Sequence, residues 1–347
     1  MVQKLHKLNN FTSQIDETNG VHRIAIDTPW PLGWVSIYIF KVDDSYVMYD
    51  AGLDMISWKR IFFSELNKLN ISIKDIDYCF VSHGHMDHYG LVRRFKQKNP
   101  NMQIITSVIT NSAIEWESDP NNYDEMMEIA EENAKLMRMY GMNKKQTDQL
   151  TEWATFWQRF GKPMEPDRIL RDNEEISFPS NKLKMIWTPG HALGHMCIWD
   201  ERNRHLFSGD HILSRITPHI GHFLVSPILD IEYDFRDILK HYLESLDRID
   251  NLNAKILFPA HQDIIFDPHK RIVELKKHHE NRLNDMSNII KNKPLTPLEI
   301  SQIHFGDLDD MNMAMAILET LGHLIYLENT NKIERIEKDD KILFVSN

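Results

Sequence analysis

The sequence predicts an α/β protein in which helices and strands form layers, with a helical insertion and a smaller C-terminal domain. Strand-like apolar runs alternate with helical periodicity over residues 21–106. The segment 111–166 interrupts this alternation, and the order helix, helix, hairpin follows residue 276. At 347 residues the chain exceeds one typical compact domain, so we expect two, spanning 1–275 and 276–347.

The N-terminal part predicts three strands and then a helix. The strands are expected at Val21–Ile26, Val35–Phe40 and Tyr46–Tyr49, with turn residues at 42–45 forming an antiparallel hairpin. Apolar residues at helical spacing over Ser57–Leu69 predict the helix, with Ser57 at its N-cap.

The next stretch predicts strand, helix and strand. An apolar run at Tyr78–Val81 predicts a buried strand, Leu91–Lys98 a short helix, and Met102–Thr106 the following strand. Such alternation also occurs in dinucleotide-binding folds. No glycine-rich GxGxxG segment follows an early strand, so we set that fold aside.

The insertion at 111–166 is rich in methionine and aromatic residues. One interpretation is an ordinary helical insertion with a methionine-filled face. The other is a lid that forms an apolar substrate pocket. If it is a lid, replacing Trp153 or Trp157 by Ala should reduce turnover more than melting temperature.

The segment His83-Gly84-His85-Met86-Asp87-His88 places four metal-ligand side chains within six residues. It directly follows the strand predicted at Tyr78–Val81, where α/β proteins commonly place their chemistry. Imidazole and carboxylate ligands together favour zinc or a similar first-row metal over calcium or magnesium. The chain holds 18 histidines, so this cluster alone leaves a chance grouping open.

Three further residues occupy the same kind of position. His191 follows the apolar run Leu183–Trp187, Asp210 follows a run that begins at His205, and His261 follows 254–257. Each is flanked by Gly, Pro or Ser and directly follows a strand-like segment. Because they share the location of the first cluster, we expect one metal site built from all seven residues.

This pattern resembles the metallo-β-lactamase superfamily, in which HxHxDH precedes a distant His, Asp and His. All seven positions match, and Asp50-Ala51-Gly52 matches the first motif of the family. The resemblance implies a four-layer αββα sandwich and a metal-dependent hydrolase. It also implies that Asp50 orients a ligand histidine by a hydrogen bond, whereas His195 is expected to be a structural hydrogen-bonding residue and not a ligand.

Seven ligands exceed the four that one tetrahedral zinc ion needs, which predicts two divalent ions. The resemblance implies one ion on His83, His85 and His191, a second on Asp87, His88 and His261, and Asp210 as the bridge. Gly84 is expected to permit a sharp turn between the first two histidines. Zinc is favoured, and Mn2+ or Fe2+ is compatible with the ligand types.

Two such ions lower the pKa of a bridging water, so that hydroxide is present at cellular pH and attacks a carbonyl or phosphorus. Asp87 and Asp210 are the carboxylates that we expect to serve catalysis as well as metal binding. No GxSxG segment is present, and this chemistry needs no serine nucleophile.

The C-terminal segment predicts a winged-helix domain. His269–Ile290 is expected to be a long helix with His278 and His279 exposed. Helices at Pro297–Ile303 and Asp310–Leu321 follow, the second ended by Gly322, and then a hairpin of 324–327 with 333–336. It resembles the C-terminal domain of the β-lactamase-like protein 2 group. Twelve acidic against nine basic residues from Lys276 onward favour packing or homodimerisation over DNA recognition.

The composition of the chain disfavours two kinds of partner, nucleic acids and membranes. A net charge of -11 disfavours nucleic acid, because phosphate backbones attract basic surfaces. No apolar run reaches the roughly 20 residues of a membrane span, and residues 1–11 lack a signal-peptide core. With only two cysteines, both in strand-like runs, we expect a cytoplasmic protein without membrane contact.

These observations favour hydrolysis of an ester, thioester or lactone of a small or medium organic substrate. The alternatives are an RNA phosphodiesterase of the endoribonuclease kind, and a mononuclear iron dioxygenase that shares the HxHxDH pattern. The fold does not choose among them, because substrate specificity depends on the pocket.

Overall fold

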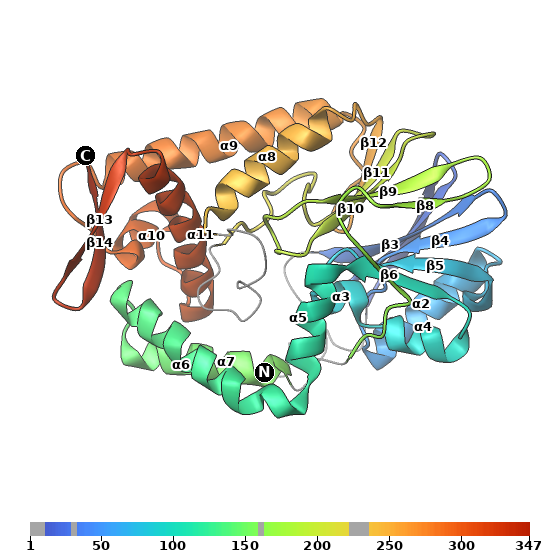
Figure 1. Cartoon of the computed structure of the whole chain (residues 1–347), viewed down its shortest axis with the longest axis horizontal. Helices are drawn as coiled ribbons and strands as arrows, with labels where there is room; N and C mark the ends of the chain where they lie inside the picture. The colour runs from blue at the N-terminus through green and yellow to red at the C-terminus, as the bar shows by residue number, and fades with distance from the viewer. Residues whose placement is uncertain (1–10, 29–32, 159–162, 222–235) are drawn as a thin grey trace. The chain divides into compact units, whose positions relative to one another are not determined.

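The computed structural model in Figure 1 describes residues 11–28, 33–158, 163–221 and 236–347, and for 153–158 the backbone only. The chain divides into two compact units. The first comprises 1–115, 162–218 and 248–271, and the second 116–161, 219–247 and 272–347. Most of the insertion thus groups with the C-terminal residues. The expected boundary at residues 275 and 276 stays a prediction.

The larger sheet of the first unit has the strand order β1-β2-β3-β4-β5-β6-β7 (Figure 1). Its first four strands pair antiparallel, and β4 to β7 pair parallel. The strands expected at 21–26, 35–40, 46–49, 78–81 and 102–106 are confirmed, whereas β1 was not foreseen. The strands are β1 (Ser13–Thr18), β2 (Val21–Asp27), β3 (Trp34–Val42), β4 (Ser45–Tyr49), β5 (Ile76–Phe80), β6 (Gln103–Ser107) and β7 (Arg168–Leu170).

Helices α2 (Ile56–Lys68) and α4 (Val92–Lys98) lie beside this sheet in Figure 1 and share one apolar core with it. Trp58, Phe62 and Phe95 from these helices are fully buried there against strand residues such as Ile37. Both helices were predicted, but Met55 and not Ser57 is the N-cap of α2. A 3-10 turn at Ile73–Asp75 leads into β5.

The smaller sheet has the order β12-β11-β10-β9-β8, antiparallel except for the parallel pair β11 and β12. A second apolar core joins the two sheets, with stacked rings of Phe40 and Phe207 at 4.3 Å and of Phe207 and Phe258 at 5.1 Å. The strands are β8 (Glu175–Ser177), β9 (Lys182–Trp187), β10 (Met196–Asp200), β11 (His205–Gly209) and β12 (Ile256–Pro259).

The insertion is helical, as predicted. It contains α5 (Val108–Ser118), a 3-10 turn at Pro120–Asn122, α6 (Tyr123–Met139) and α7 (Lys144–Gln158). Residues 159–162, and the side chains of Trp153 and Trp157 on which the lid interpretation rested, lie outside the described part. The choice between lid and ordinary insertion therefore stays open.

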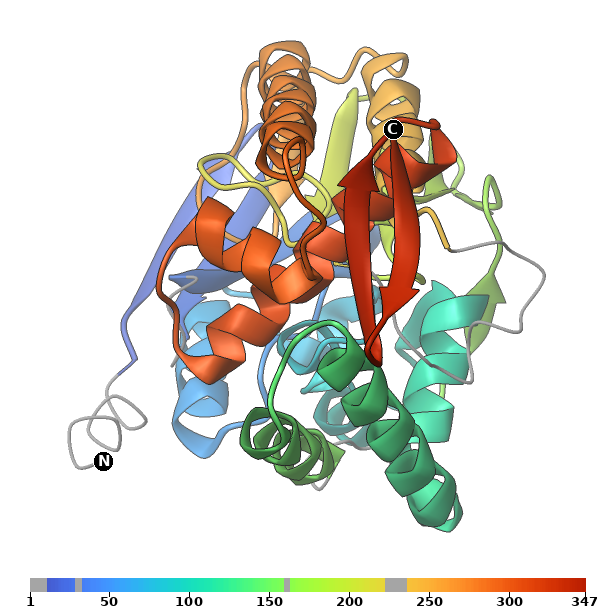
Figure 2. The ribbon, with the colours of Figure 1, turned by 90° about the vertical axis from the view of Figure 1, so that its left-hand side faces the viewer.

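The C-terminal region has the predicted order of helix, helix and hairpin, and Figure 2 shows the hairpin as two long strands. The elements are α9 (Pro268–Ile289), α10 (Pro297–Phe305), α11 (Asp310–Asn329), β13 (Ile333–Lys338) and β14 (Lys341–Ser346). Thr296 caps α10 as expected, with Glu299 closing a capping box.

Three details of this region were predicted wrongly. Helix α11 does not end at Gly322, because the buried face containing Leu321 and Leu324 continues through it. The hairpin pairs β13 with β14 through Asp339 and Asp340, which both have positive φ as a type I′ turn requires. His279 is fully buried and hydrogen-bonded to His323, not exposed.

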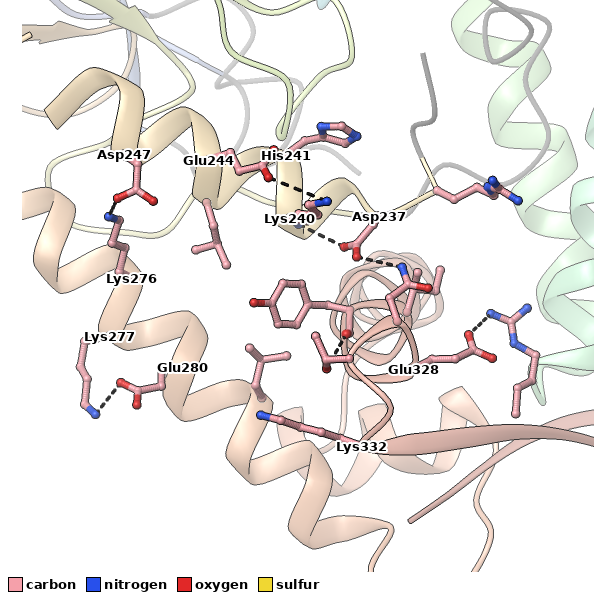
Figure 3. Close-up of a pocket in the computed structure, with 18 of the residues that line it drawn as sticks. Asp237, Lys240, His241, Glu244, Asp247, Lys276, Lys277, Glu280, Glu328 and Lys332 are labelled. Atoms are coloured by element: carbon pink, nitrogen blue, oxygen red, sulfur yellow. Dashed lines mark hydrogen bonds and ion pairs between the residues drawn. The ribbon is translucent and has the colours of Figure 1, made fainter. Parts of the chain in front are cut away.

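Most of helix α8 (Ile238–Asp250) also belongs to the second unit. This unit contains a cavity of ≈ 1660 Å³ that is lined by parts of α8, α9, α11 and β13 (Figure 3). Opposite charges in its lining largely pair with one another. Examples are Lys240 with Glu244, Lys276 with Asp247, Lys277 with Glu280, and Arg335 with Glu328. Separately, none of the helices in the described ranges has the length and apolar character for a bilayer crossing.

Candidate metal centre

The segment 82–89 places four candidate ligands just beyond the end of β5. Strand β5 stops at Phe80, and His85 then precedes the short helix α3 (Met86–Tyr89), so that Asp87 and His88 lie on its single turn. Gly84 does not need glycine's freedom, contrary to our expectation. Its φ is not positive, and an added Cβ would only touch Ile114 at 3.4 Å.

Three histidines form a first donor group. The Nε2 of His83 lies 2.8 Å from Nδ1 of His85, and the Nε2 of His191 lies 3.1 Å from that same Nδ1. His191 comes from the loop between β9 and β10, over 100 positions away in the chain. The fold thus brings together the three residues predicted for one ion.

A second donor group contains Asp87, His88 and His261. Oxygens of Asp87 lie 3.6 Å from the Nε2 atoms of both His88 and His261. All three side chains are buried, and His261 stands at the end of β12 in the smaller sheet. Residues from both sheets therefore contribute to this group.

Asp210 joins the two groups. Its Oδ2 lies 3.4 Å from Nε2 of His191, 3.7 Å from Nε2 of His88 and 3.3 Å from Nε2 of His261. Donor atoms of His83, His88 and Asp210 also converge on one another. The position of this carboxylate is the one that a bridging ligand would occupy.

The donors fit divalent metal ions. Two nitrogens on one tetrahedral zinc ion lie about 3.3 Å apart, since each bond is about 2.0 Å long. The separations of 2.8–3.7 Å between donor atoms of the two groups and Asp210 bracket this value. Among the described residues, Nε2 of His88, Nε2 of His261 and Oδ1 of Asp210 are buried without a hydrogen-bond partner. Buried polar atoms are rarely left so, and metal coordination would satisfy them.

The remaining ring nitrogens are held by hydrogen bonds that select the tautomer. His88 Nδ1 donates to Asp50 at 2.8 Å, and His261 Nδ1 donates to the backbone oxygen of Trp34 at 2.8 Å. His83 Nδ1 lies 3.0 Å from Oγ of Ser82, whose hydroxyl donates to Asp50. Each bond leaves the Nε2 lone pair directed at the centre.

Asp50 therefore has the role that the resemblance implied. The carboxylate is fully buried and also accepts the backbone N–H of Ser82 at 2.8 Å. Its φ of 65° lies in the left-handed region, which Asp and Asn tolerate best among residues with a side chain. The contributions of Ser82 and of the Trp34 carbonyl were not anticipated. A backbone carbonyl leaves no trace in the sequence, so only the structure could reveal the second.

The electrostatics favour positive charge at the centre. Burial alone lowers the pKa of His88, but Asp87, Asp210 and Asp50 outweigh it and raise that pKa to about 10. Burial raises the pKa of Asp210, yet the imidazoles of His261 and His88 hold it well below its usual value. A carboxylate that stays ionised among imidazoles, as Asp210 does, creates the environment in which a divalent cation is stabilised.

Sequence comparison identifies two family regions in the chain. The family described as the metallo-beta-lactamase superfamily matches residues 31–261, which include all seven candidate ligands. The family described as metallo-beta-lactamase-like, C-terminal domain, matches residues 283–346. Together these matches cover most of both compact units.

Individual relatives agree with these matches. The chain is 23% identical to the probable metallo-hydrolase YqjP of Bacillus subtilis, covering 94% of this chain and 98% of that protein. It is 24% identical to the lactamase-like protein aptB of Emericella nidulans, covering 83% and 74%. The beta-lactamase-like protein 2 homolog of Caenorhabditis elegans is 28% identical over 39% of this chain and 41% of that protein.

Solved structures show the same fold. A metallo-beta-lactamase family protein from Thermus thermophilus superposes with a TM-score of 0.75 at 25% identity, covering 95% of this chain and 99% of that one. A beta-lactamase domain protein from Burkholderia ambifaria gives 0.79 at 20% identity, covering 96% and 94%. Both likenesses extend over nearly the whole chain and thus include the C-terminal region.

Proposed function

The chain belongs to the metallo-beta-lactamase superfamily and is a metallo-hydrolase; from this premise we propose that it is a dinuclear zinc hydrolase of organic esters, thioesters or lactones. The observation that carries the two-ion proposal is the position of Asp210. Its Oδ2 lies within 3.7 Å of donor atoms from both the first and the second donor group. A single tetrahedral ion would leave about three of the seven ligands without a role.

We propose that His83, His85 and His191 hold one ion, that Asp87, His88 and His261 hold the other, and that Asp210 bridges them. When bound, such ions lower the pKa of a coordinated water toward neutrality and polarise the scissile group. The protein's own contribution is geometric. Asp50, Ser82 and the Trp34 carbonyl keep three imidazoles in the tautomer and orientation that the ions require.

A small organic substrate is supported by the methionines of the insertion. On α6, Met126, Met127 and Met139 remain partly exposed, whereas Met137 is buried. Partly exposed methionines can adapt to an irregular apolar ligand. An acyl substrate with a hydrophobic chain would fit such a surface better than a charged polymer would.

Charge argues against nucleic acid as the partner. The net charge is -11, and the cavity of the second unit (Figure 3) has cationic side chains paired with carboxylates. Paired cations offer little attraction to a phosphate backbone. We likewise propose that the C-terminal domain serves packing or homodimerisation, which light scattering on the full chain would test.

The test begins with metal analysis of the purified protein, followed by assays on thioesters, lactones, aryl esters, bis-p-nitrophenyl phosphate and RNA. We expect two zinc ions per chain and turnover of carbonyl substrates, and loss of both in Asp210→Asn. Faster cleavage of RNA or of the phosphodiester would overturn the substrate class in favour of a phosphodiesterase. One iron per chain with oxygen uptake would instead indicate a dioxygenase.

A further inference from the structure

His195 is a buried imidazole whose ring packs against that of the candidate ligand His83, with ring centroids 5.2 Å apart, and whose hydrogen bond to the metal centre is to a backbone group. It lies directly before β10 and is 0% exposed. Its Nε2 is 3.0 Å from the backbone nitrogen of Asp210, and its Nδ1 is 2.8 Å from Oγ1 of Thr188, which is also buried. None of the donor groups that form the centre includes this imidazole.

These two contacts determine the tautomer of His195. A backbone N–H can only donate, so Nε2 must present a lone pair to Asp210. The proton then lies on Nδ1 and is donated to Thr188 Oγ1. The threonine hydroxyl has acceptors of its own, the backbone oxygen of His195 at 3.4 Å and Sγ of Cys197 at 3.4 Å. The network is neutral, directional and closed off from solvent.

The same peptide unit is held from its other side. The carbonyl of Gly209 accepts the backbone N–H of Ala260 at 2.9 Å, and Ala260 directly precedes His261. The Gly209–Asp210 peptide plane is therefore held at its oxygen by Ala260, the residue after β12, and at its nitrogen by His195. The pairing of β11 with β12 shifts register between Phe207 and Gly209, so regular strand pairing does not orient this peptide.

Close packing makes the contact with His195 specific. Gly209 has a φ of 49°, and a Cβ added there would lie 2.5 Å from Nε2 of His195 and 3.0 Å from Oη of Tyr49. Only glycine allows the imidazole to approach this peptide so closely. Position 209 thus combines two requirements that glycine alone meets, a left-handed backbone and the absence of a side chain.

We propose that His195, held in one tautomer by Thr188, is a positioning residue that orients the Gly209–Asp210 peptide and thereby places the Asp210 carboxylate between the two donor groups. The inference rests on the proposed metal centre, since it concerns how Asp210 meets the ions. Rotation of this peptide would carry Oδ2 of Asp210 away from His191, His88 and His261, which now lie 3.3–3.7 Å from it.

The test compares two amide replacements. In His195→Gln the side-chain oxygen can reach the former position of Nε2 and still accept the Asp210 N–H. In His195→Asn the shorter amide reaches only the former position of Nδ1 and keeps the Thr188 contact. His205→Asn is the matched control, because His205 is a buried imidazole on β11 that packs against Phe258.

The readouts are zinc affinity by chelator competition, the visible spectrum of the cobalt-loaded protein, and thermal unfolding of the chelator-treated protein. We expect His195→Asn to lose about 10- to 100-fold in affinity and to change the cobalt spectrum. His195→Gln and His205→Asn should stay within a few-fold of wild type. Equal behaviour of the Asn and Gln variants, or a loss explained entirely by lower stability of the chelator-treated protein, would overturn the proposal.

If His195→Asn does not fold, Thr188→Val decides. It preserves the shape of the side chain but removes the acceptor of Nδ1–H, so we expect weaker zinc binding and an altered cobalt spectrum; an unchanged affinity would overturn the proposal. Failure of the proposed function is a separate outcome. A wild type that binds one ion would contradict the dinuclear centre, while the comparison of the variants would still test the placement of Asp210.

Discussion

Replacing Asp50 by Asn should weaken metal binding by about 10- to 100-fold without disturbing the fold. The change preserves the size of the side chain, and Asn tolerates the φ of 65° at this position as well as Asp does. What changes is the hydrogen-bonding character of the atom 2.8 Å from Nδ1 of His88. In one orientation of the amide its nitrogen would face the Nδ1–H donor of His88, and in the other it would face the backbone N–H of Ser82.

Two donors cannot bond to each other, so the second orientation disrupts the bond to Ser82 beside the candidate ligand His83, and in the first orientation His88 must rotate or move its proton to Nε2. Either response of His88 removes the Nε2 lone pair from the second donor group, which also contains Asp87 and His261. A hydrogen bond to a charged group contributes about 1.5–3 kcal/mol, and a 10- to 100-fold loss of affinity is about 1.4–2.8 kcal/mol. The two magnitudes agree.

The assay is zinc content and affinity at buffered free zinc, with activity measured in parallel. Asp54→Asn is the matched control, since Asp54 pairs with Lys59 and Arg94 and belongs to none of the donor groups. We expect Asp50→Asn to lose the ion on the side of His88 first. If it binds both ions as tightly as Asp54→Asn does, the argument that Asp50 selects the tautomer is wrong.

Three further outcomes follow from the same structure. Asp210→Asn should lower the rate of hydrolysis by more than about 100-fold and should also lower the metal content, because Oδ2 of Asp210 lies near both donor groups. Activity close to that of the wild type would refute the two-ion centre. Chelation by EDTA should lower the melting temperature measured by calorimetry, since a ligand at about 1,000 times its Kd stabilises the native state by about 4 kcal/mol per site. An unchanged melting temperature would mean that metal does not bind the native state preferentially. Burial, with smaller contributions from His278 and Arg282, lowers the pKa of His279 from 6.5 to about 3. The unfolded state therefore binds this proton first, so the stabilising contribution is complete above pH about 6.5 and is lost as pH falls toward about 3. Urea unfolding of His279→Gln should show a pH slope smaller than wild type by up to about 1.4 kcal/mol per pH unit, and equal slopes would contradict this.

The sheets of the first unit were largely predictable because their strands are short, apolar and bounded by turn residues. The C-terminal helix α11 was less so. Gly322 is a common helix terminator, but the apolar face of α11 stabilises the helix through it to Asn329. The hairpin of β13 and β14 therefore lies further along the chain than predicted, since residues 324–327 belong to the helix. At these positions the burial of apolar side chains outweighed the local preference of the sequence.

The candidate ligands were predictable for a different reason. Each of the seven is a His or Asp just beyond a strand-like run, and the ends of neighbouring strands meet at one edge of a sheet. The hydrogen-bond partners of these ligands were harder to predict from the sequence. Ser82 adjoins His83 in the chain, yet nothing local indicates that its hydroxyl connects that histidine to Asp50.

The sequence by itself determined the ligand types, their order along the chain and the layered class of the fold, because these depend on local chemistry and periodicity. Only the tertiary structure decided which nitrogen of each imidazole faces the centre, that Asp210 lies between the two groups, and that His195 holds its peptide in place. The physical reason is that a tautomer and a carboxylate's direction depend on contacts that folding creates, such as Asp50 for His88, Trp34 for His261 and His195 for Asp210.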